Sequence, residues 1–246
     1  MAGNTFSDPQ FIKNEDSSEL ERFDYIVANP PFSLKNWSDG LKEYGRFSGY
    51  GDRPPEKNGD YAWLMHILKT LKSTGKAAVI LPHGVLFRGA AEGRIRQKVI
   101  EENLLDAVIG LPENLFYGTP IPACILVFKK NRPNTDVLFI DASKKDEDGN
   151  PRYIKASNQN ELGQRHIDAI VQAYQDRTEQ EKFAHVATLD EIKENEYNLN
   201  IPRYVDTFEE EAPIDLQQVQ SNIARLKAEI ADAEKKMDAY LKELGL

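Results

Sequence analysis

Short apolar runs recur along the first 143 residues of the chain, each bounded by proline, glycine or polar positions. They are rich in β-branched and aromatic residues and lack polar alternation, which is typical of strands covered on both faces. One run stops abruptly at Asn-Pro-Pro, a sequence typical of turns. The predicted strands are residues 23–28, 76–82, 104–112, 123–130 and 136–143.

Amphipathic stretches lie between some of these runs. Residues 59–75 place apolar side chains at the spacing of one helix face and end at Gly75, which predicts a helix with a glycine cap. Residues 91–104 show the same spacing and predict a second helix. Apolar strands that alternate with helices predict a doubly wound α/β sheet, which carries helices on both faces.

The composition changes after residue 145. From residue 146 onward Asp, Glu, Asn and Gln dominate, and the strand-helix alternation stops. Helical patches remain near residues 161–174 and 188–194. The sequence therefore predicts three parts, which are an α/β domain over residues 1–145, an acidic mixed or helical extension over 146–213, and a terminal helix over 214–246.

The terminal segment has the clearest periodicity of the chain. Its apolar residues alternate by three and four positions, which is the heptad spacing of a helix that packs against other helices. The pattern lasts for four repeats and predicts an apolar seam that must be buried in a helical bundle or, as the alternative, against the chain's own α/β domain. The seam consists of Leu216, Val219, Ile223, Leu226, Ile230, Ala233, Met237, Tyr240 and Leu244.

Charge and composition limit the classes of protein to which this chain can belong. Residues 1–130 contain 16 basic and 16 acidic residues, so the net charge of −9 belongs to residues 131–246. Because basic groups that neutralise phosphates supply most affinity for nucleic acid, this balance predicts weak DNA binding without a partner. No apolar run approaches the roughly 20 residues of a membrane span, and no signal peptide is recognisable, so we expect a cytoplasmic protein.

One cysteine and four scattered histidines offer neither a disulfide framework nor the spacing of a zinc site. We therefore expect no structural metal. Cys124 lies within an apolar run, where a free thiol is typical of core packing.

The NPPF loop (residues 29–32) carries the most specific chemistry of the sequence, because it directly follows the predicted strand 23–28. Methylation of an exocyclic amino group needs the nitrogen lone pair freed from the ring, and two acceptors for the amino hydrogens favour that state. The Asn29 amide and the Pro30 carbonyl can supply the two acceptors. Pro30 and Pro31 stiffen the loop, and Phe32 can stack on a target base that has left the helix.

A turn without chemistry is the alternative for this motif, since Asn-Pro is common wherever a strand ends. The preceding strand favours the functional interpretation. In a doubly wound sheet, sites form in the loops at the carboxyl edge, and the NPPF loop falls there.

The chain resembles the modification (M) subunit of type I restriction-modification systems. FDYIVANPPFS is similar to motif IV of the amino-methyltransferases, and further stretches match the C-terminal two thirds of that subunit. They are GDYAWLMHILKTLKSTGKAAVILPHGVLFRG, IRQKVIEENLLDAVIGLPENLFYGTPIPACILVFKK and YNLNIPRYVDTFEEE.

This resemblance implies a Rossmann-like methyltransferase sheet that transfers methyl from S-adenosylmethionine to adenine N6 of DNA. It also implies assembly with a specificity subunit, which reads the DNA sequence, and with a restriction subunit. Members of the family place a glycine-rich cofactor loop before motif IV, and no such turn occurs among the 28 residues before Asn29. We therefore expect little or no cofactor binding by this chain alone, with Asn4, Asn29 and Pro31 as its cofactor-binding residues.

The resemblance places a second aromatic wall of the base pocket at Phe116 and Tyr117, and ordinary packing by one of them is the alternative. The long loop after the motif interleaves basic and aromatic residues, which suits contact with a DNA backbone and a displaced base. A merely solvated loop is the alternative for this segment. The predicted DNA contacts are Lys35, Arg46, Arg53 and Lys57, among the aromatic residues Trp37, Tyr44, Phe47 and Tyr50. His83 follows a strand, and we interpret it as a loop histidine with a structural partner.

Two other functions remain open from the sequence. Similar NPP loops serve methyltransferases that act on a glutamine amide or on RNA. In a different class of function, the chain is a non-catalytic assembly module that binds partners through residues 214–246. Without a partner, the seam could also pair two copies into a homodimer.

Overall fold

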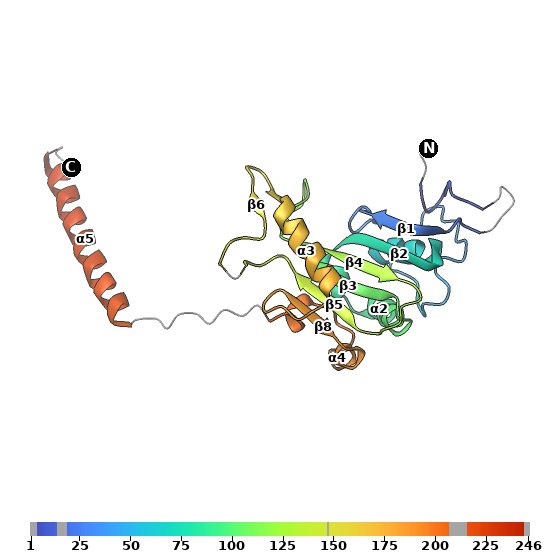
Figure 1. The fold of residues 1–246 in the computed structure, drawn as a ribbon. Helices are drawn as coiled ribbons and strands as arrows, with labels where there is room; N and C mark the ends of the chain where they lie inside the picture. Colours follow the sequence, from blue (N-terminus) through green and yellow to red (C-terminus); the bar gives the residue numbers. More distant parts are fainter. Residues whose placement is uncertain (1–3, 14–18, 147, 207–215, 244–246) are drawn as a thin grey trace. The chain divides into compact units, whose positions relative to one another are not determined.

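The computed structural model describes residues 4–13, 19–146, 148–206 and 216–243 (Figure 1). The chain divides into two units, residues 1–207 and 208–246. The first unit holds a six-stranded sheet in the order β1-β2-β4-β3-β5-β8. Its strands are β1 Phe23–Ala28, β2 Leu71–Pro82, β3 Leu105–Gly110, β4 Ala123–Lys129, β5 Val137–Asp141 and β8 Ala184–Ala187.

Four of these strands run in one direction. β1 pairs with β2 in parallel, as β3 does with β5. β4 lies antiparallel between β2 and β3, and β8 runs antiparallel to β5. The sheet is mixed, with a mainly parallel centre, and its carboxyl edge collects the loops that follow β1, β2, β3 and β5.

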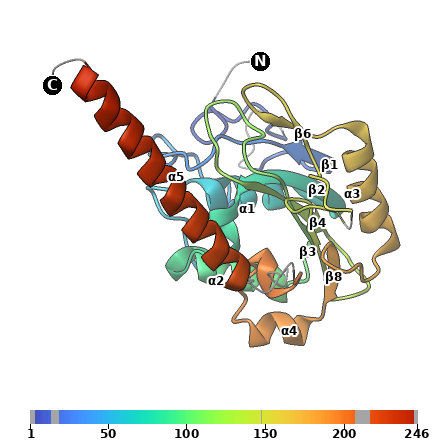
Figure 2. The same cartoon turned by 90° about the vertical axis from the view of Figure 1, so that its left-hand side faces the viewer.

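Helices cover both faces of the sheet (Figure 2). α1 Asp60–Thr70 and α2 Ala90–Glu101 share one apolar core with β2, β3 and β4. α3 Gln164–Asp176 packs on the other face against β3 and β5. The α/β prediction is confirmed in this respect. The shorter elements are the 3-10 helices η1 His83–Leu86 and η2 Ile201–Arg203, the helix α4 Leu189–Glu194, and the hairpin of β6 Ile154–Lys155 and β7 Asn160–Glu161.

The predicted helix over residues 59–75 is too long at its C-terminal end. α1 ends at Thr70, and Leu71 already has the extended backbone of β2. Leu71 pairs with Phe23 of β1, and the Cβ of any other residue at Gly75 would lie 3.0 Å from the Phe23 carbonyl oxygen. The glycine therefore permits close packing of two strands and does not cap a helix.

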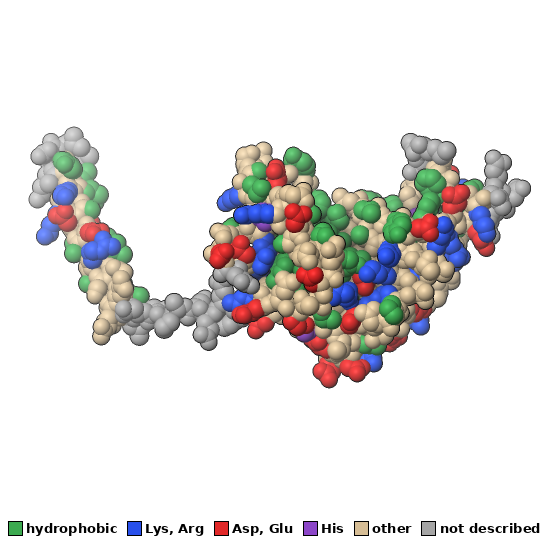
Figure 3. All heavy atoms as spheres, in the orientation of Figure 1, with side chains coloured by type: hydrophobic (Ala, Val, Ile, Leu, Met, Phe, Trp, Pro, Cys, Tyr) green, Lys and Arg blue, Asp and Glu red, His purple; other side chains and the backbone are tan. Residues whose placement is uncertain are grey.

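The prediction that residues 23–28 form a strand buried on both faces is half right. Ile26 and Ala28 pack against the core beneath α1. Tyr25 and Val27, which point to the other face, are 74% and 85% exposed. Within the described part of the chain, β1 pairs with β2 alone and is an edge strand. Figure 3 shows hydrophobic side chains at the surface in this region.

The predicted boundary at residue 145 is wrong. β8 joins the sheet beside β5, and the Asp141 N–H donates to the Phe183 carbonyl at 2.8 Å. Tyr204 stacks on Phe139 of β5, with ring centroids 3.9 Å apart. Residues 146–206 therefore belong to the unit that contains the sheet. The four residues of β8 are too few to show a period, so no sequence pattern predicted this strand.

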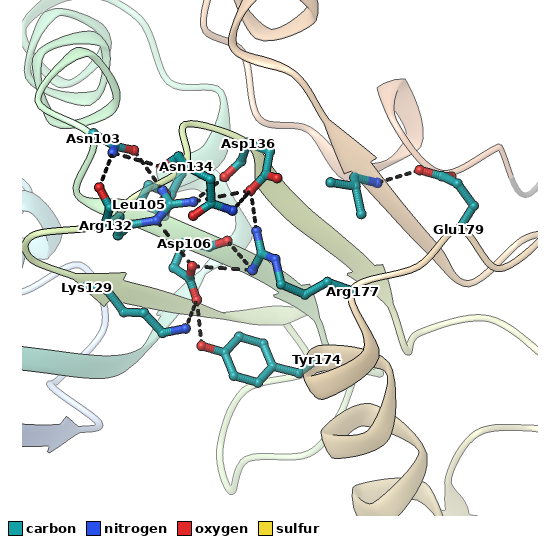
Figure 4. Close-up of polar contacts among 11 residues, drawn as sticks. Asn103, Leu105, Asp106, Lys129, Arg132, Asn134, Asp136, Tyr174, Arg177 and Glu179 are labelled. Carbon is teal, nitrogen blue, oxygen red and sulfur yellow. Dashed lines mark hydrogen bonds and ion pairs between the residues drawn. The ribbon is translucent and has the colours of Figure 1, made fainter.

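A cluster of charged and polar side chains, the Asp106 cluster, lies where β3 begins (Figure 4). Asp106 accepts a hydrogen bond from the Tyr174 hydroxyl at 2.5 Å and pairs with Lys129 at 2.8 Å and Arg177 at 3.3 Å. Burial acts to raise the pKa of Asp106, but the hydrogen bonds from Lys129 and Tyr174 lower it overall. The cluster fastens α3 to β3 and β4 at the edge opposite the carboxyl edge.

The second unit contains α5 Leu216–Glu243, a single helix of 28 residues. Its seam is exposed, with Ile223 and Leu226 at 48% and Ile230 at 58%. Leu244, the last residue of the predicted seam, lies outside the described residues. The helix forms as expected, and its burial in a bundle stays a prediction. No helix in the described ranges is long and apolar enough to cross a membrane.

Candidate active site

The NPPF loop leaves the carboxyl end of β1. Asn29 and Pro31 are exposed, Pro30 is buried and Phe32 is half-buried. Ser33 follows with a left-handed backbone, at φ 51°, which a residue with a side chain adopts only where contacts hold it. A buried proline at the base and a fixed residue at the end therefore leave the Asn29 side chain presented to solvent on a rigid turn.

Phe116 lies next to Phe32. The ring centroids are 5.7 Å apart and the planes meet at 74°, an edge-to-face contact. A base sandwiched between two rings needs about 7 Å, twice the van der Waals separation of stacked groups. The structure thus joins the two predicted aromatic residues, and Phe116 must move for a base to lie between them. Tyr117 is 87% exposed.

The loop that carries Phe116 rests on the β6–β7 hairpin. The Asn160 side-chain amide donates to the Glu113 carbonyl at 2.8 Å, and the Asn160 backbone N–H donates to the Asn114 carbonyl at 2.7 Å. Asn160 is buried. The hairpin therefore supports the aromatic loop through two hydrogen bonds, a contact that sequence spacing could not indicate.

A second group of charged residues, the Asp60 cluster, lies behind the NPPF loop and was missed by sequence reasoning. Asp60 is fully buried and accepts the Ser33 backbone N–H at 2.7 Å. Arg88 pairs with Asp60 at 2.6 Å and also with Glu92. Burial acts to lower the pKa of Arg88, but both carboxylates raise it overall. Asp60 opens α1, so in the sequence it looks like an ordinary acidic residue of a first helical turn.

The prediction that Arg46 contacts DNA is wrong. Its side chain is fully buried, and it donates to the carbonyls of Thr5 at 2.8 Å, Phe6 at 2.9 Å and Lys42. Burial lowers the pKa of Arg46 to about 10. Arg46 therefore fastens the N-terminal segment to the long loop and is not available to a phosphate.

The aromatic residues of the same loop are largely structural as well. Trp37 is buried in a small core with Phe6 and Ala62, and Phe47 and Tyr50 pack against buried apolar residues. The Trp37 ring is therefore not available to a displaced base as it lies. Their apolar character reflects the core that this loop builds for itself.

The other three predicted DNA contacts are accessible to solvent. Lys35 and Lys57 are exposed. Arg53 is half-exposed, pairs with Glu43 at 3.2 Å and lies 5.7 Å from the centroid of the Trp37 ring. Contact with DNA therefore stays a prediction for Lys35, Arg53 and Lys57.

Cofactor binding stays a prediction for Asn4, Asn29 and Pro31. Asn29 and Pro31 are exposed at the carboxyl edge of the sheet. Asn4 uses its side-chain oxygen to accept the N–H groups of Phe6 at 2.9 Å and Ser7 at 3.2 Å, which closes a local turn. No glycine lies between residues 4 and 39, so these residues supply no glycine-rich turn. Among the residues that the structure describes, no group of His, Cys, Asp and Glu is placed to hold a metal ion.

The environments of Cys124 and His83 are typical of residues with a structural role. Cys124 is fully buried in the core, and burial raises the pKa of its thiol. The His83 Nε2 lies 2.9 Å from the Ala123 carbonyl oxygen, and burial lowers the pKa of the ring. Both contacts agree with the structural interpretation of these residues.

Comparison with known proteins places this geometry in context. A family model described as N-6 DNA Methylase matches residues 1–212. The MjaVII type I restriction enzyme methylase subunit of Methanocaldococcus jannaschii is 35% identical over 226 residues, covering 87% of this chain and 37% of that protein. The HindI methylase subunit of Haemophilus influenzae is 33% identical over 254 residues, covering 98% of this chain and 54% of that protein. The chain thus spans 37% and 54% of the length of these two relatives.

The chain is also similar to a solved structure. The methyltransferase subunit of the type I restriction-modification system from Streptococcus thermophilus is 46% identical, with a TM-score of 0.73. The match covers 83% of this chain and 41% of that one. The likeness at this identity extends to sequence as well as to fold.

Proposed function

The chain belongs to the N-6 DNA methylase family of type I restriction-modification methylase subunits, and we propose that its NPPF loop methylates adenine N6 of DNA in the intact enzyme. The observation that carries the proposal is the position of Asn29, exposed on a fixed turn at the carboxyl edge with Phe32 and Phe116 beside it. S-adenosylmethionine, when bound, would supply the electrophilic methyl group.

The residues of the loop divide the work of orienting the base. The Asn29 amide oxygen and the Pro30 carbonyl oxygen each accept one hydrogen bond from the adenine amino group. These hydrogen bonds favour the geometry in which the nitrogen lone pair can attack. Phe32 stacks on the flipped base, and Phe116 moves aside from its edge contact to close the second wall. Tyr117, exposed beside Phe116, lies at the mouth of this pocket. No nucleophilic side chain is needed, because the adenine nitrogen itself attacks.

Phe32→Ala tests the base pocket. Stacking on an aromatic ring is worth about 1–3 kcal/mol per base, so we expect roughly a ten- to hundredfold loss of methylation at limiting DNA. The measurement is transfer of labelled methyl to adenine by the complete modification complex. Phe11→Ala removes an exposed ring beside the other end of β1 and should leave the rate unchanged. Equal rates for Phe32→Ala and the unmodified enzyme would contradict a stacking role.

The 246-residue chain alone is expected to bind S-adenosylmethionine weakly or not at all. Asn29 and Pro31 offer one side of a site, and Asn4 has its side-chain oxygen in a local turn. Titration calorimetry measures the affinity directly. Micromolar binding by the isolated chain would contradict this account of the cofactor site.

The exposed seam of α5 supports a second part of the proposal, which concerns assembly with other subunits. Nine apolar positions in heptad spacing suit a helical bundle, and we propose that the specificity subunit supplies the partner helices and that the restriction subunit joins this complex. The same seam favours a second candidate function, an assembly module without catalysis of its own. Cofactor-dependent methylation by the complete complex, lost on mutation of the NPPF loop, separates the two. Without a partner, the seam would pair two copies of the chain.

A further inference from the structure

We propose that Asp60 is a positioning residue, which holds the end of the NPPF loop through Ser33 and is itself fixed by Arg88. The inference rests on the proposed function, because the atoms that it positions are those of Asn29 and Phe32. It assigns a catalytic consequence to a charged cluster that touches no substrate.

The residues that directly follow the NPPF loop are hydrogen-bonded to the start of α1. Ser33 is the residue next to Phe32, and its backbone N–H donates to Asp60 Oδ1 at 2.7 Å. One residue further, the Leu34 carbonyl accepts the Gly59 N–H at 2.9 Å. These two hydrogen bonds join the loop to the first residues of α1. They also hold Ser33 at its positive φ of 51°, so they set the direction in which the chain leaves the motif.

The other carboxylate oxygen is fixed as firmly. Asp60 Oδ2 pairs with an Arg88 guanidinium nitrogen at 2.6 Å, and the Asp60 side chain is only 1% exposed. Arg88 is held in turn by Glu92, which is 4% exposed. Each oxygen of Asp60 thus has its own partner, and the carboxylate cannot rotate without losing one of them. A buried carboxylate whose two oxygens both have partners is held in a single arrangement.

The absence of a side chain at Gly84 leaves the space that the Arg88 guanidinium occupies. A Cβ at position 84 would collide with the guanidinium of Arg88, because the two occupy the same space. Gly84 lies in η1, directly after β2, so the carboxyl edge of a second strand borders the cluster. Three segments therefore meet behind the NPPF loop, which are the residues after the motif, the start of α1 and the segment 84–92.

Asp60→Asn is the sharpest test, because asparagine keeps the shape of the side chain. Its amide can accept from Ser33 and turn its nitrogen toward Arg88, or accept from Arg88 and turn its nitrogen toward the Ser33 N–H. Either orientation sets two donors against each other, so one contact is lost. A misplacement of about 1 Å costs roughly a hundredfold in rate. We therefore expect kcat of the complete modification complex to fall about ten- to hundredfold, with affinity for S-adenosylmethionine unchanged.

Asp106→Asn is the matched control, because Asp106 is also a buried aspartate with cationic partners and lies at the opposite edge of the sheet (Figure 4). Thermal unfolding should show that both variants lose stability, whereas only Asp60→Asn should lose kcat. Fluorescence of 2-aminopurine at the target position adds a readout of base capture. It should change for Asp60→Asn and stay as in the unmodified enzyme for Asp106→Asn.

Gly84→Ala provides an independent variant, since it displaces Arg88 and leaves Asp60 in place. If Asp60→Asn does not fold, a fall in kcat for Gly84→Ala supports the proposal and an unchanged kcat overturns it. An unchanged kcat in folded Asp60→Asn overturns it as well, as does an equal loss in Asp60→Asn and Asp106→Asn. These results stay distinct from failure of the proposed function, which would appear as methylation that survives mutation of Asn29 itself.

Discussion

Replacing Asn29 with alanine in the complete modification complex is expected to abolish adenine methylation. In the proposed function the amide oxygen is one of two acceptors for hydrogen bonds from the amino group of the base, and it would act where charge develops in the transition state. Loss of one preorganised group of this kind typically reduces kcat by about 10²–10³. The side chain is exposed, so its removal should leave the fold intact. Transfer of labelled methyl to adenine measures the effect.

Asn158→Ala is a suitable control, because Asn158 is an exposed asparagine in the turn between β6 and β7. Among the described residues, no hydrogen bond joins it to the NPPF loop. It should methylate at the normal rate. Unfolding temperatures for both variants should match that of the unmodified chain. Near-normal methylation by folded Asn29→Ala would refute the assignment of the NPPF loop.

The double variant Ile223→Glu and Ile230→Glu is expected to lose assembly with the specificity subunit. Both residues belong to the seam of α5, and both are about half-exposed in the chain by itself, at 48% and 58%. In a helical bundle they would be buried, and burial of two unpaired carboxylates is strongly unfavourable. Co-purification with the specificity subunit measures the loss. If the seam also pairs two copies of the chain, the same variant should be monomeric in sedimentation.

A second double variant controls for added charge. Ser221→Glu and Ala228→Glu place the same two charges, seven residues apart, on α5 outside the seam. Assembly should survive these changes. Circular dichroism should show helical content for both double variants. Undiminished assembly by folded Ile223→Glu and Ile230→Glu would show that the seam is not the interface, and would favour packing of α5 against its own α/β unit.

The elements that the sequence predicts well are those whose pattern is local. Apolar runs long enough to show their character give β2 to β5, and helical spacing gives α2 and the long α5. The NPPF loop can be recognised for the same reason, because the motif consists of four consecutive residues directly after a strand. Where a pattern was too short or ambiguous, the prediction failed. β8 has only four residues, and Leu71 continues the apolar spacing of α1 although it begins β2.

Only the tertiary structure decided which charged residues are buried. Arg46 looked like a phosphate contact in a basic and aromatic loop, yet carbonyls some 40 residues earlier in the chain hold it in the interior. Asp60 has no distinguishing pattern in the sequence, yet its carboxylate lies between Ser33 and Arg88. The desolvation of a charge is offset only by specific partners, and those partners come from distant parts of the sequence. The sequence by itself therefore determined the elements with a long local pattern and the motif, and the fold determined what holds the motif in place.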